Sequence, residues 1–437
     1  MFCQLEVLRQ CFPPSVRRIL EELPESLDET YERILREIKK PNQGHAHRLL
    51  QCLVVAARPL DVKELAEVLA FDFNIGGIPK LNPGWRWEDQ EEAVMSACSS
   101  LVTIVKDGDS QVVQFSHFSV KEFLTADRLA EPIRDVTQYH IRLEAAHAIL
   151  AQACLGVLLR LDDRVDNISI KNFPLARYAA QYWPAHAQVE HVSSRIKDGM
   201  ECLFDADKPH FATWLWIYNE DRWGRSMSTT RPEEPEAVPL YYAARLGFRD
   251  LAEHLIAEHP EYANTRGGYH ETAIHAAALA GQADILSLLI QHGGDVNDRY
   301  EHPRQYTPLL VASEYGRLEA GNFLLNHGAD INARDVFNDT TLMYATIRGH
   351  VEFARMLLER GVIIDLRGYK CQTALHYAVK KDSVEFVRLL LEHGADVNVR
   401  DGEGNTPSQL RSRSPEIIEL LSEYGAKSAK GSTCCRP

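Results

Sequence analysis

Hydrophobic residues in the C-terminal half of the chain recur in a pattern about 33 residues long. The clearest copy runs from Thr373 to Asn405 and reads TALHYAVKKDSVEFVRLLLEHGADVNVRDGEGN. Its apolar spacing predicts a short helix over 374–380 and a second helix over 384–392. Gly394 then suits the left-handed conformation that often ends a helix. Because a single copy leaves hydrophobic faces uncovered, the pattern predicts a stack of copies.

Threonines at matched positions open the successive copies. They are Thr272, Thr307, Thr340, Thr373 and Thr406, spaced 35, 33, 33 and 33 residues apart. A more divergent copy begins at Val238. The pattern resembles the ankyrin repeat in both its period and its T-P-L-H-x-A signature. The resemblance implies an α-solenoid over residues 238–427, with about five to six repeats of which the first and last are degenerate.

Two histidines occupy the histidine position of the repeat signature, His275 and His376. The resemblance implies that both bond to neighbouring turns. A pairing of His270 with His275 for zinc is disfavoured, because a spacing of five residues places the two rings on different helix faces. The Asp-Val-Asn ending of the repeat, as in residues 396–398, recurs with the period. We therefore expect loop hydrogen bonding there rather than metal binding.

The N-terminal half follows a different pattern. Apolar spacing predicts helices over residues 28–38 and 45–57. From residue 58 onward it predicts two helices, a strand hairpin turning at 107–109, and a further helix over 116–129. Helix, helix, hairpin, helix is the order of a winged-helix domain, which we place at residues 58–130.

A helical connector is expected over residues 131–225. It contains a tryptophan-rich stretch with Trp214, Trp216 and Trp223, which we interpret as core rather than as a ligand site. Residues 226–237 are rich in Ser, Thr, Pro and Glu and are typical of a linker. Residues 428–437 form a tail.

Several segments of this half resemble a second family. LPESLDETYERIL, ARPLDVKELAEVLA, CSSLVTIV, VQFSHFSVKEFL, NFPLARYAAQYWPAHA and DKPHFATWLWIY are similar to the region after the nucleotide-binding core of fungal NACHT proteins. Those proteins are signal-transduction NTPases of the STAND class, related to NLR immune receptors. The resemblance implies that residues 1–57 are the end of a NACHT module, and that the chain is a fragment lacking the NTPase core.

Without the NTPase core, this chain is not expected to bind or hydrolyse nucleotides as members of that family do. A phosphate-binding P-loop needs a Gly-Lys pair, and the sequence contains none. We expect no nucleotide binding by this chain alone, no cofactor and no enzymatic activity. His117 matches the winged-helix histidine that contacts the β-phosphate of ADP in the family, so the resemblance implies nucleotide sensing if a separate core is supplied. The alternative is a helix-capping or buried histidine.

The charge and hydrophobicity of the chain disfavour nucleic acids and membranes as partners. The chain has 437 residues and a net charge of −14. Residues 58–130 hold seven lysines and arginines against twelve aspartates and glutamates, which disfavours nucleic-acid binding by the winged helix. No apolar run is long enough to span a membrane, and nine scattered cysteines favour a reducing compartment. We expect a cytoplasmic protein that binds neither nucleic acid nor membranes.

The ankyrin resemblance implies a partner-binding surface on the concave side. There the fifth signature position points from the first helix of each repeat toward the groove. The candidates are these positions, the residues one turn later, and aromatic residues near the tips of the connecting loops: Tyr242, Ala276, Val311, Tyr344, Tyr377, Tyr315, Arg348, Lys381, Tyr300, Phe337 and Tyr369. Tyrosine suits an interface anchor because it offers a large apolar area at low entropy cost. The alternative is that these rings pack between neighbouring helices.

The sequence therefore predicts a mainly α protein, with a winged helix and helical connector followed by an ankyrin-repeat α-solenoid. Its expected function is to recognise proteins as a scaffold of an NLR-like fungal signalling protein. Two alternatives stay open. One is a regulatory part of a nucleotide-switch NTPase whose core is missing here, and the other is an inactive gene fragment.

Overall fold

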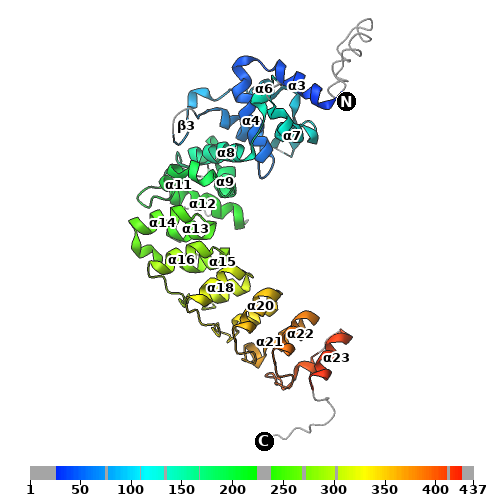
Figure 1. Cartoon of the computed structure of the whole chain (residues 1–437). Helices are drawn as coiled ribbons and strands as arrows, with labels where there is room; N and C mark the ends of the chain where they lie inside the picture. Colours follow the sequence, from blue (N-terminus) through cyan, green and yellow to red (C-terminus); the bar gives the residue numbers. More distant parts are fainter. Residues whose placement is uncertain are drawn as a thin grey trace. The chain divides into compact units, whose positions relative to one another are not determined.

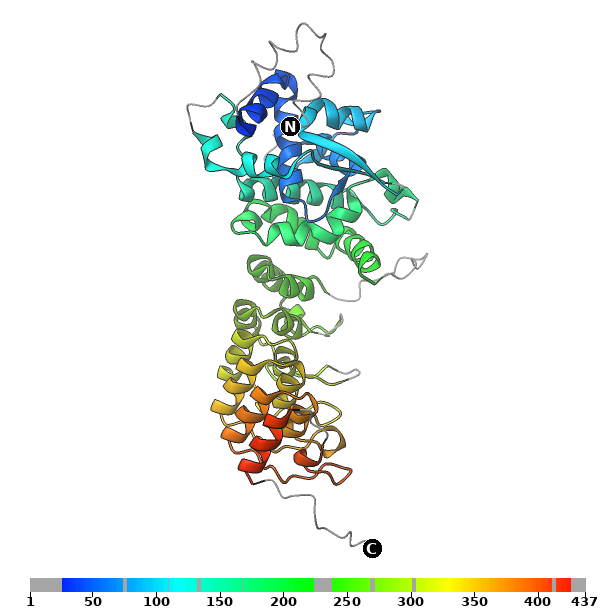
Figure 2. The same ribbon diagram turned by 90° about the vertical axis from the view of Figure 1, so that its right-hand side faces the viewer.

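The structure is a computed structural model of the whole chain, shown in two views in Figures 1 and 2. It describes residues 26–73, 77–108, 110–131, 135–166, 168–223, 238–267, 272–300, 304–410 and 414–425. The chain divides into two compact units, residues 1–235 and 236–437, which we treat separately. The expected linker 226–237, the tail 428–437 and the first 25 residues lie outside the described residues.

The first unit contains a winged helix. Its elements in chain order are α4 (Gln43–Val55), β1 (Leu60–Asp61), α5 (Val62–Leu69), α6 (Gln90–Cys98), β4 (Val102–Asp107) and β5 (Ser110–Phe115). The three strands form one antiparallel sheet in the order β1-β5-β4. A reciprocal cap starts α5, because the Asp61 carboxylate accepts the Lys63 N–H while Glu64 accepts the Asp61 N–H. The expected order of helix, helix, hairpin and helix is confirmed, since a further helix follows β5.

The expected boundary at residue 57 separates elements that pack together. Helix α4 packs against α5, α6 and β5, so it shares the core of the winged helix rather than preceding it. Amphipathic spacing revealed that α4 exists, but spacing along the chain does not say which element covers its apolar face. A short strand pair, β2 (Phe71–Asp72) with β3 (Lys80–Leu81), was also not expected.

Two further helices, one before and one after these elements, belong to the same region. Helix α3 (Leu27–Glu37) starts at Ser26, whose hydroxyl accepts the Glu29 N–H. Helix α7 (Phe118–Thr125) is shorter than the expected 116–129, because Ala126 adopts an extended conformation and a 3-10 turn, η4 (Asp127–Ala130), follows. The remaining 3-10 turns of this unit are η1 (Lys40–Asn42), η2 (Pro83–Trp85), η3 (Ser99–Leu101), η5 (Thr137–Tyr139) and η6 (Ser169–Asn172).

The connector is a bundle of helices around an aromatic core. Its helices are α8 (Leu143–Leu158), α9 (Ala176–Ala187), α10 (Val192–Arg195), α11 (Lys197–Phe204) and α12 (His210–Trp223). Trp183 and Trp214 meet edge to face with ring centroids 5.8 Å apart, and the Trp214 indole donates to the Ala180 carbonyl. Trp214 and Trp216 are both buried, so their interpretation as core is confirmed; the side chain of Trp223 lies outside the description.

The second unit is the expected solenoid, stacked as helix pairs in chain order (Figure 1). The pairs are α13 (Pro239–Leu246) with α14 (Arg249–Glu258), α15 (Ala273–Ala280) with α16 (Ala283–Gln291), α17 (Pro308–Glu314) with α18 (Leu318–Asn326), α19 (Thr341–Arg348) with α20 (Val351–Glu359), and α21 (Ala374–Lys380) with α22 (Val384–Glu392). The last repeat keeps a 3-10 turn, η9 (Pro407–Gln409), and α23 (Pro415–Glu423). Two further 3-10 turns are η7 (Pro260–Ala263) and η8 (Tyr369–Cys371). The loops joining one pair to the next, which we call fingers, lie along one side of the stack (Figure 2).

Hydrogen bonds between repeats explain the recurring residues. The His275 Nδ1 atom lies 2.6 Å from the Thr272 hydroxyl, and its Nε2 atom lies 3.1 Å from the Tyr306 carbonyl of the next repeat. His376 makes the same pair of bonds, to Thr373 and to the Asn405 carbonyl. The expected role of both histidines is therefore confirmed, and it is structural.

Candidate functional site: the fingertip patch

Two neighbouring fingers of the solenoid expose apolar side chains at their tips. Val336 and Phe337 belong to one finger and Tyr369 to the next, and their exposed fractions are 42%, 49% and 50%. The Phe337 and Tyr369 rings meet edge to face with centroids 5.8 Å apart. We call these three residues the fingertip patch. An exposed pair of aromatic rings in contact, with a third apolar side chain next to it in the sequence, makes this surface a candidate interaction site.

A buried carboxylate fixes the first finger. Asp335 accepts the backbone N–H groups of Phe337 and Asp339 at 2.9 and 2.8 Å, and it also accepts the Tyr344 hydroxyl at 2.9 Å. Asp335 is only 5% exposed. Because three donors converge on Asp335, the backbone that carries Phe337 is held in one conformation.

A second carboxylate fixes the next finger in the same way. Asp339 accepts the Tyr369 N–H at 2.9 Å and the Tyr377 hydroxyl at 3.1 Å. Gly368 is required beside it, because a Cβ there would collide with the Asp339 carboxylate. Each of the two tyrosines therefore supports a fingertip through a carboxylate.

The protonation states of the two tyrosines suit their hydrogen bonds to the carboxylates. Burial raises the pKa values of the Tyr344 and Tyr377 phenols, so both remain protonated donors at neutral pH. Burial also raises the pKa of Asp339, against the lowering effect of the Tyr369 N–H and the Tyr377 hydroxyl.

The fingertips contain strained backbone. Lys370 and Cys371 both have left-handed conformations, with φ angles of 55° and 57°. The matched positions in other fingers, Gln305, Asn338 and Gly404, are left-handed too. Only glycine adopts this region without strain, and residues that keep such strain gather at functional sites. The second finger of the patch thus carries two strained residues in succession.

Five of the residues expected to bind a partner are covered, and the binding role of the concave strip stays a prediction. Tyr242, Ala276, Tyr300, Val311 and Tyr344 are buried, so they do not line an open groove. Tyr300, Val311 and Tyr344 pack in one cluster with Tyr306, Leu310 and Ala333. The rings of Tyr300 and Tyr344 both meet the Tyr306 ring, with centroids 5.6 and 5.1 Å apart, which is the packing described by the alternative.

The remaining candidates reach the surface. Tyr315, Arg348, Lys381, Phe337 and Tyr369 are exposed, and Tyr377 is half-buried. Arg348 pairs with Glu314 on the neighbouring first helix. Sequence reasoning missed the carboxylates of Asp335 and Asp339. A signal for the first existed, because Asp401 lies two periods after Asp335 and accepts the N–H groups of Glu403 and Asn405 in the same way.

His117 lies in the first unit and caps a helix. Its exposed ring accepts the Ser119 N–H through Nδ1 at 3.3 Å and starts α7. The Phe118 ring beside it is 71% exposed. The capping alternative is therefore correct for the local role of His117, while its response to a separate nucleotide-binding core stays a prediction.

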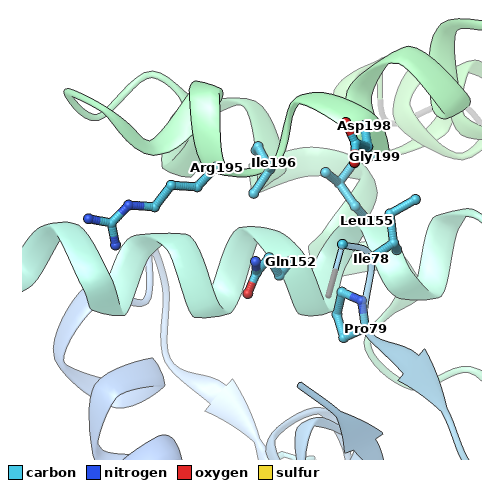
Figure 3. Close-up of a pocket in the computed structure, with 9 residues that line it drawn as sticks. Ile78, Pro79, Gln152, Leu155, Arg195, Ile196, Asp198 and Gly199 are labelled. Atoms are coloured by element: carbon cyan, nitrogen blue, oxygen red, sulfur yellow. The ribbon is translucent and has the colours of Figure 1, made fainter. Parts of the chain in front are cut away.

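The first unit also contains a small cavity beside α8 (Figure 3). It is lined by Gly77, Ile78 and Pro79, by Gln152 and Leu155 of α8, and by Arg195, Ile196, Asp198 and Gly199. Its volume of about 20 Å³ is enough for roughly one water molecule, far below the size of an ordinary ligand pocket. Within the described ranges, no group of three or more His, Cys, Asp or Glu side chains could hold a metal ion. None of the helices in those ranges is both long and apolar enough to cross a bilayer.

Comparisons with known proteins agree with both architectures. Residues 240–335 and 334–401 match the family model "Ankyrin repeats (3 copies)". Residues 31–133 match "GPI inositol-deacylase, winged helix domain", a range that includes α4. The chain therefore combines a winged helix with ankyrin repeats, which are a protein–protein interaction module.

Individual relatives cover parts of the chain. "Azaphilone pigments biosynthesis cluster protein L" of Monascus ruber is 33% identical over 298 residues, which is 63% of this chain and 61% of that protein. "Ankyrin repeat and SAM domain-containing protein 6" of Rattus norvegicus is 31% identical over 111 residues, which is 25% of this chain and 12% of that protein. The chain thus spans less than two thirds of either relative. Among solved structures, the human ASB11 ankyrin repeat domain is 22% identical with a TM-score of 0.40, covering 49% of this chain and 95% of that one.

Proposed function

We propose that this protein is a protein-binding scaffold that engages its partner through the fingertip patch. The contact of the exposed Phe337 and Tyr369 rings carries the proposal, because aromatic side chains supply most of the energy at many interfaces. Their backbones are fixed by Asp335 and Asp339 before any partner arrives. A surface ordered in advance loses less conformational entropy on binding.

The predicted residues around the patch take different roles in this proposal. Phe337 and Tyr369 are the anchors. Tyr344 and Tyr377 are positioning residues, because they reach the fingertips only through the two carboxylates. Tyr315, Arg348 and Lys381 are exposed at the C-terminal ends of the first helices, whereas the fingers lead into the N-terminal ends, so their part in binding stays a separate prediction. The partner needs an apolar segment that inserts between neighbouring fingers.

The cellular setting is also a proposal. The resemblance to fungal NACHT proteins and the similarity to a fungal cluster protein support a role in signalling or non-self recognition of fungal type, in the cytoplasm. The exposure of His117 favours one further candidate, a regulatory part that meets a nucleotide bound by a separate core. The isolated chain should show no ATP affinity by calorimetry, and micromolar binding would contradict that expectation.

The test replaces the two anchors and compares the variant with an equally exposed apolar site. Phe337→Ala with Tyr369→Ala should reduce partner capture from a lysate of the source organism at least tenfold, while the melting temperature changes by no more than about 1 °C. Ile418→Ala on α23 is the matched control, because Ile418 is 59% exposed. A photo-reactive phenylalanine analogue at position 337 should form crosslinks to the same partner.

A third variant separates anchors from positioning residues. Tyr344→Phe removes only the hydroxyl that Asp335 accepts, so the core remains filled and capture should still fall several-fold. The proposal is wrong if the double variant and Ile418→Ala capture the partner equally well.

A further inference from the structure

A loop of the winged helix exposes two tryptophans. Trp85 and Trp87 lie in the segment from Asn82 to Asp89, which we call the tryptophan loop, and they are 46% and 48% exposed. Most tryptophan surface in folded proteins is covered, so two neighbouring exposed indoles need an explanation. The packing of the winged helix does not account for their exposure.

The residue between the tryptophans is anchored in the core. Arg86 forms an ion pair of 2.5 Å with Glu67, whose side chain is only 2% exposed. The other Glu67 oxygen accepts the Leu175 N–H at 2.8 Å, and the Arg86 guanidinium also lies 5.7 Å from the Phe173 ring centroid. The Arg86 side chain reaches the buried Glu67 while remaining 35% exposed, and the tryptophans on either side of it stay at the surface.

Both ends of the loop are fixed as well. The Asn82 N–H donates to the Ala70 carbonyl at 2.8 Å, and the Asn82 side chain accepts the Gly84 N–H at 3.0 Å. At the other end Asp89 accepts the Glu92 N–H at 2.9 Å and starts α6. The two indoles are therefore presented by a rigid segment, which lowers the entropy lost when a partner binds.

The surroundings of the tryptophans are acidic. Glu88, Asp89, Glu91 and Glu92 are all exposed within eight residues of Trp85. Among the described lysines, arginines and histidines, none forms an ion pair with any of them, and the Gln111 amide donates to Glu91. Exposed aromatic rings beside carboxylates that form no ion pair attract cations, both through charge and through the faces of the rings.

We propose that the tryptophan loop is a second docking surface, and that its partner is a basic protein segment with lysine or arginine next to apolar side chains. The indoles bind the apolar part and the carboxylates bind the basic part. The same carboxylates repel the phosphates of nucleic acids and the headgroups of anionic membranes. The loop lies in the first unit, so this proposal stands independently of the fingertip patch.

The test uses the full chain with the fingertip patch removed by Phe337→Ala and Tyr369→Ala. A library of random 12-residue peptides on phage is selected against that chain. The selected peptides should be enriched in lysine or arginine together with apolar residues. Their affinity should fall at least tenfold when Trp85→Ala and Trp87→Ala are added, with an unchanged circular dichroism spectrum.

Two further variants define the surface. Glu88→Gln with Glu92→Gln should weaken the same peptides several-fold and reduce the dependence of their binding on salt. Phe118→Ala removes an exposed aromatic ring elsewhere in the first unit and should have no effect. Selected peptides that are acidic, or that bind equally well after loss of both tryptophans, overturn the proposal. Tryptophan-dependent binding to phosphatidylserine vesicles instead of to the peptides overturns it too.

Discussion

The two units of this protein differ in how far apart along the chain their bonded residues lie. In the solenoid, Asn297 bonds Asp330, 33 residues away, and Arg360 bonds Asn322, 38 residues away. In the first unit, Glu67 bonds Leu175, 108 residues away, and Tyr178 bonds Ala57, 121 residues away. The solenoid is thus held by contacts between neighbouring repeats, whereas the first unit is held by contacts that join distant segments.

This difference has a thermodynamic consequence. The stability of a repeat array is approximately a sum of repeat and interface contributions, so damage in one repeat affects mainly its neighbours. A core built from distant segments loses its structure as a whole, because each bond holds elements that the rest of the fold also needs. All six tryptophans lie between residues 85 and 223, so tryptophan fluorescence reports on the first unit alone.

The largest expected effect comes from a charge in the solenoid. Leu390 is fully buried in α22. Leu390→Asp should destabilise the C-terminal repeats by about 4–5 kcal/mol, because it buries an unpaired carboxylate. Hydrogen exchange in residues 340–425 should become faster, while the denaturation midpoint measured by tryptophan fluorescence stays the same.

The matched control introduces the same charge at the surface. Ile418→Asp on α23 should leave exchange in residues 340–410 within about twofold of the original protein. A shift of the fluorescence midpoint in Leu390→Asp would show that the two units unfold together, and the expected unchanged midpoint would then be wrong.

An intermediate effect is expected from pH in the first unit. His186 is buried against His147 and Tyr178, with 2.9 Å from Nδ1 to His147 and 2.9 Å from Nε2 to the Tyr178 hydroxyl. Burial, and secondarily His147, lowers the pKa of His186 to about 4. Between about pH 6.5 and about pH 4 His186 therefore binds a proton in the unfolded state but not in the folded state. The free energy of unfolding falls as the pH falls from about 6.5 toward about 4.

The expected loss between pH 7 and pH 5 is about 2 kcal/mol, measured by urea denaturation with tryptophan fluorescence. His186→Gln should reduce this pH dependence, whatever it does to stability at pH 7. Burial likewise lowers the pKa of His376 in the solenoid, so His376→Gln is the counterpart that should leave the fluorescence result unchanged. An equal pH dependence in His186→Gln and the original protein would contradict the assignment.

The smallest expected effect is a gain in stability at the fingertips. Cys371 is exposed and left-handed, and the matched position in the last finger is Gly404. Cys371→Gly should stabilise the neighbouring repeats by about 0.5–1 kcal/mol, since relief of the strain exceeds the added entropy of the unfolded chain. Thermal unfolding followed by far-UV circular dichroism measures the gain.

A second position gives the internal comparison. Asn338→Gly relieves less strain, because asparagine tolerates the left-handed region better than cysteine does, and its effect should be smaller. If Cys371→Gly destabilises the repeats, the strained backbone at position 371 is supported by contacts of its own side chain.

The candidate site shows where sequence reasoning reached its limit. The register of the repeat placed Tyr300, Phe337 and Tyr369 near the fingertips, but only the last two are exposed and Tyr300 is buried. The same register placed Tyr344 on the groove, yet its ring is buried and its hydroxyl bonds Asp335. The depth of a side chain depends on the distance to the adjacent repeat, and a repeated pattern within one chain does not contain that distance.

The sequence by itself determined the solenoid, because contacts between repeats recur at a fixed separation along the chain. The pattern within each repeat also predicts its helices and turns. It also determined the order of the winged-helix elements, through local hydrophobic periodicity. The tertiary structure decided which elements share a core and which side chains remain exposed. Helix α4 joins the winged helix, and Arg86 reaches the buried Glu67 while Trp85 and Trp87 stay at the surface. Such outcomes rest on partners about 20 to 120 residues away, whose approach no local pattern encodes.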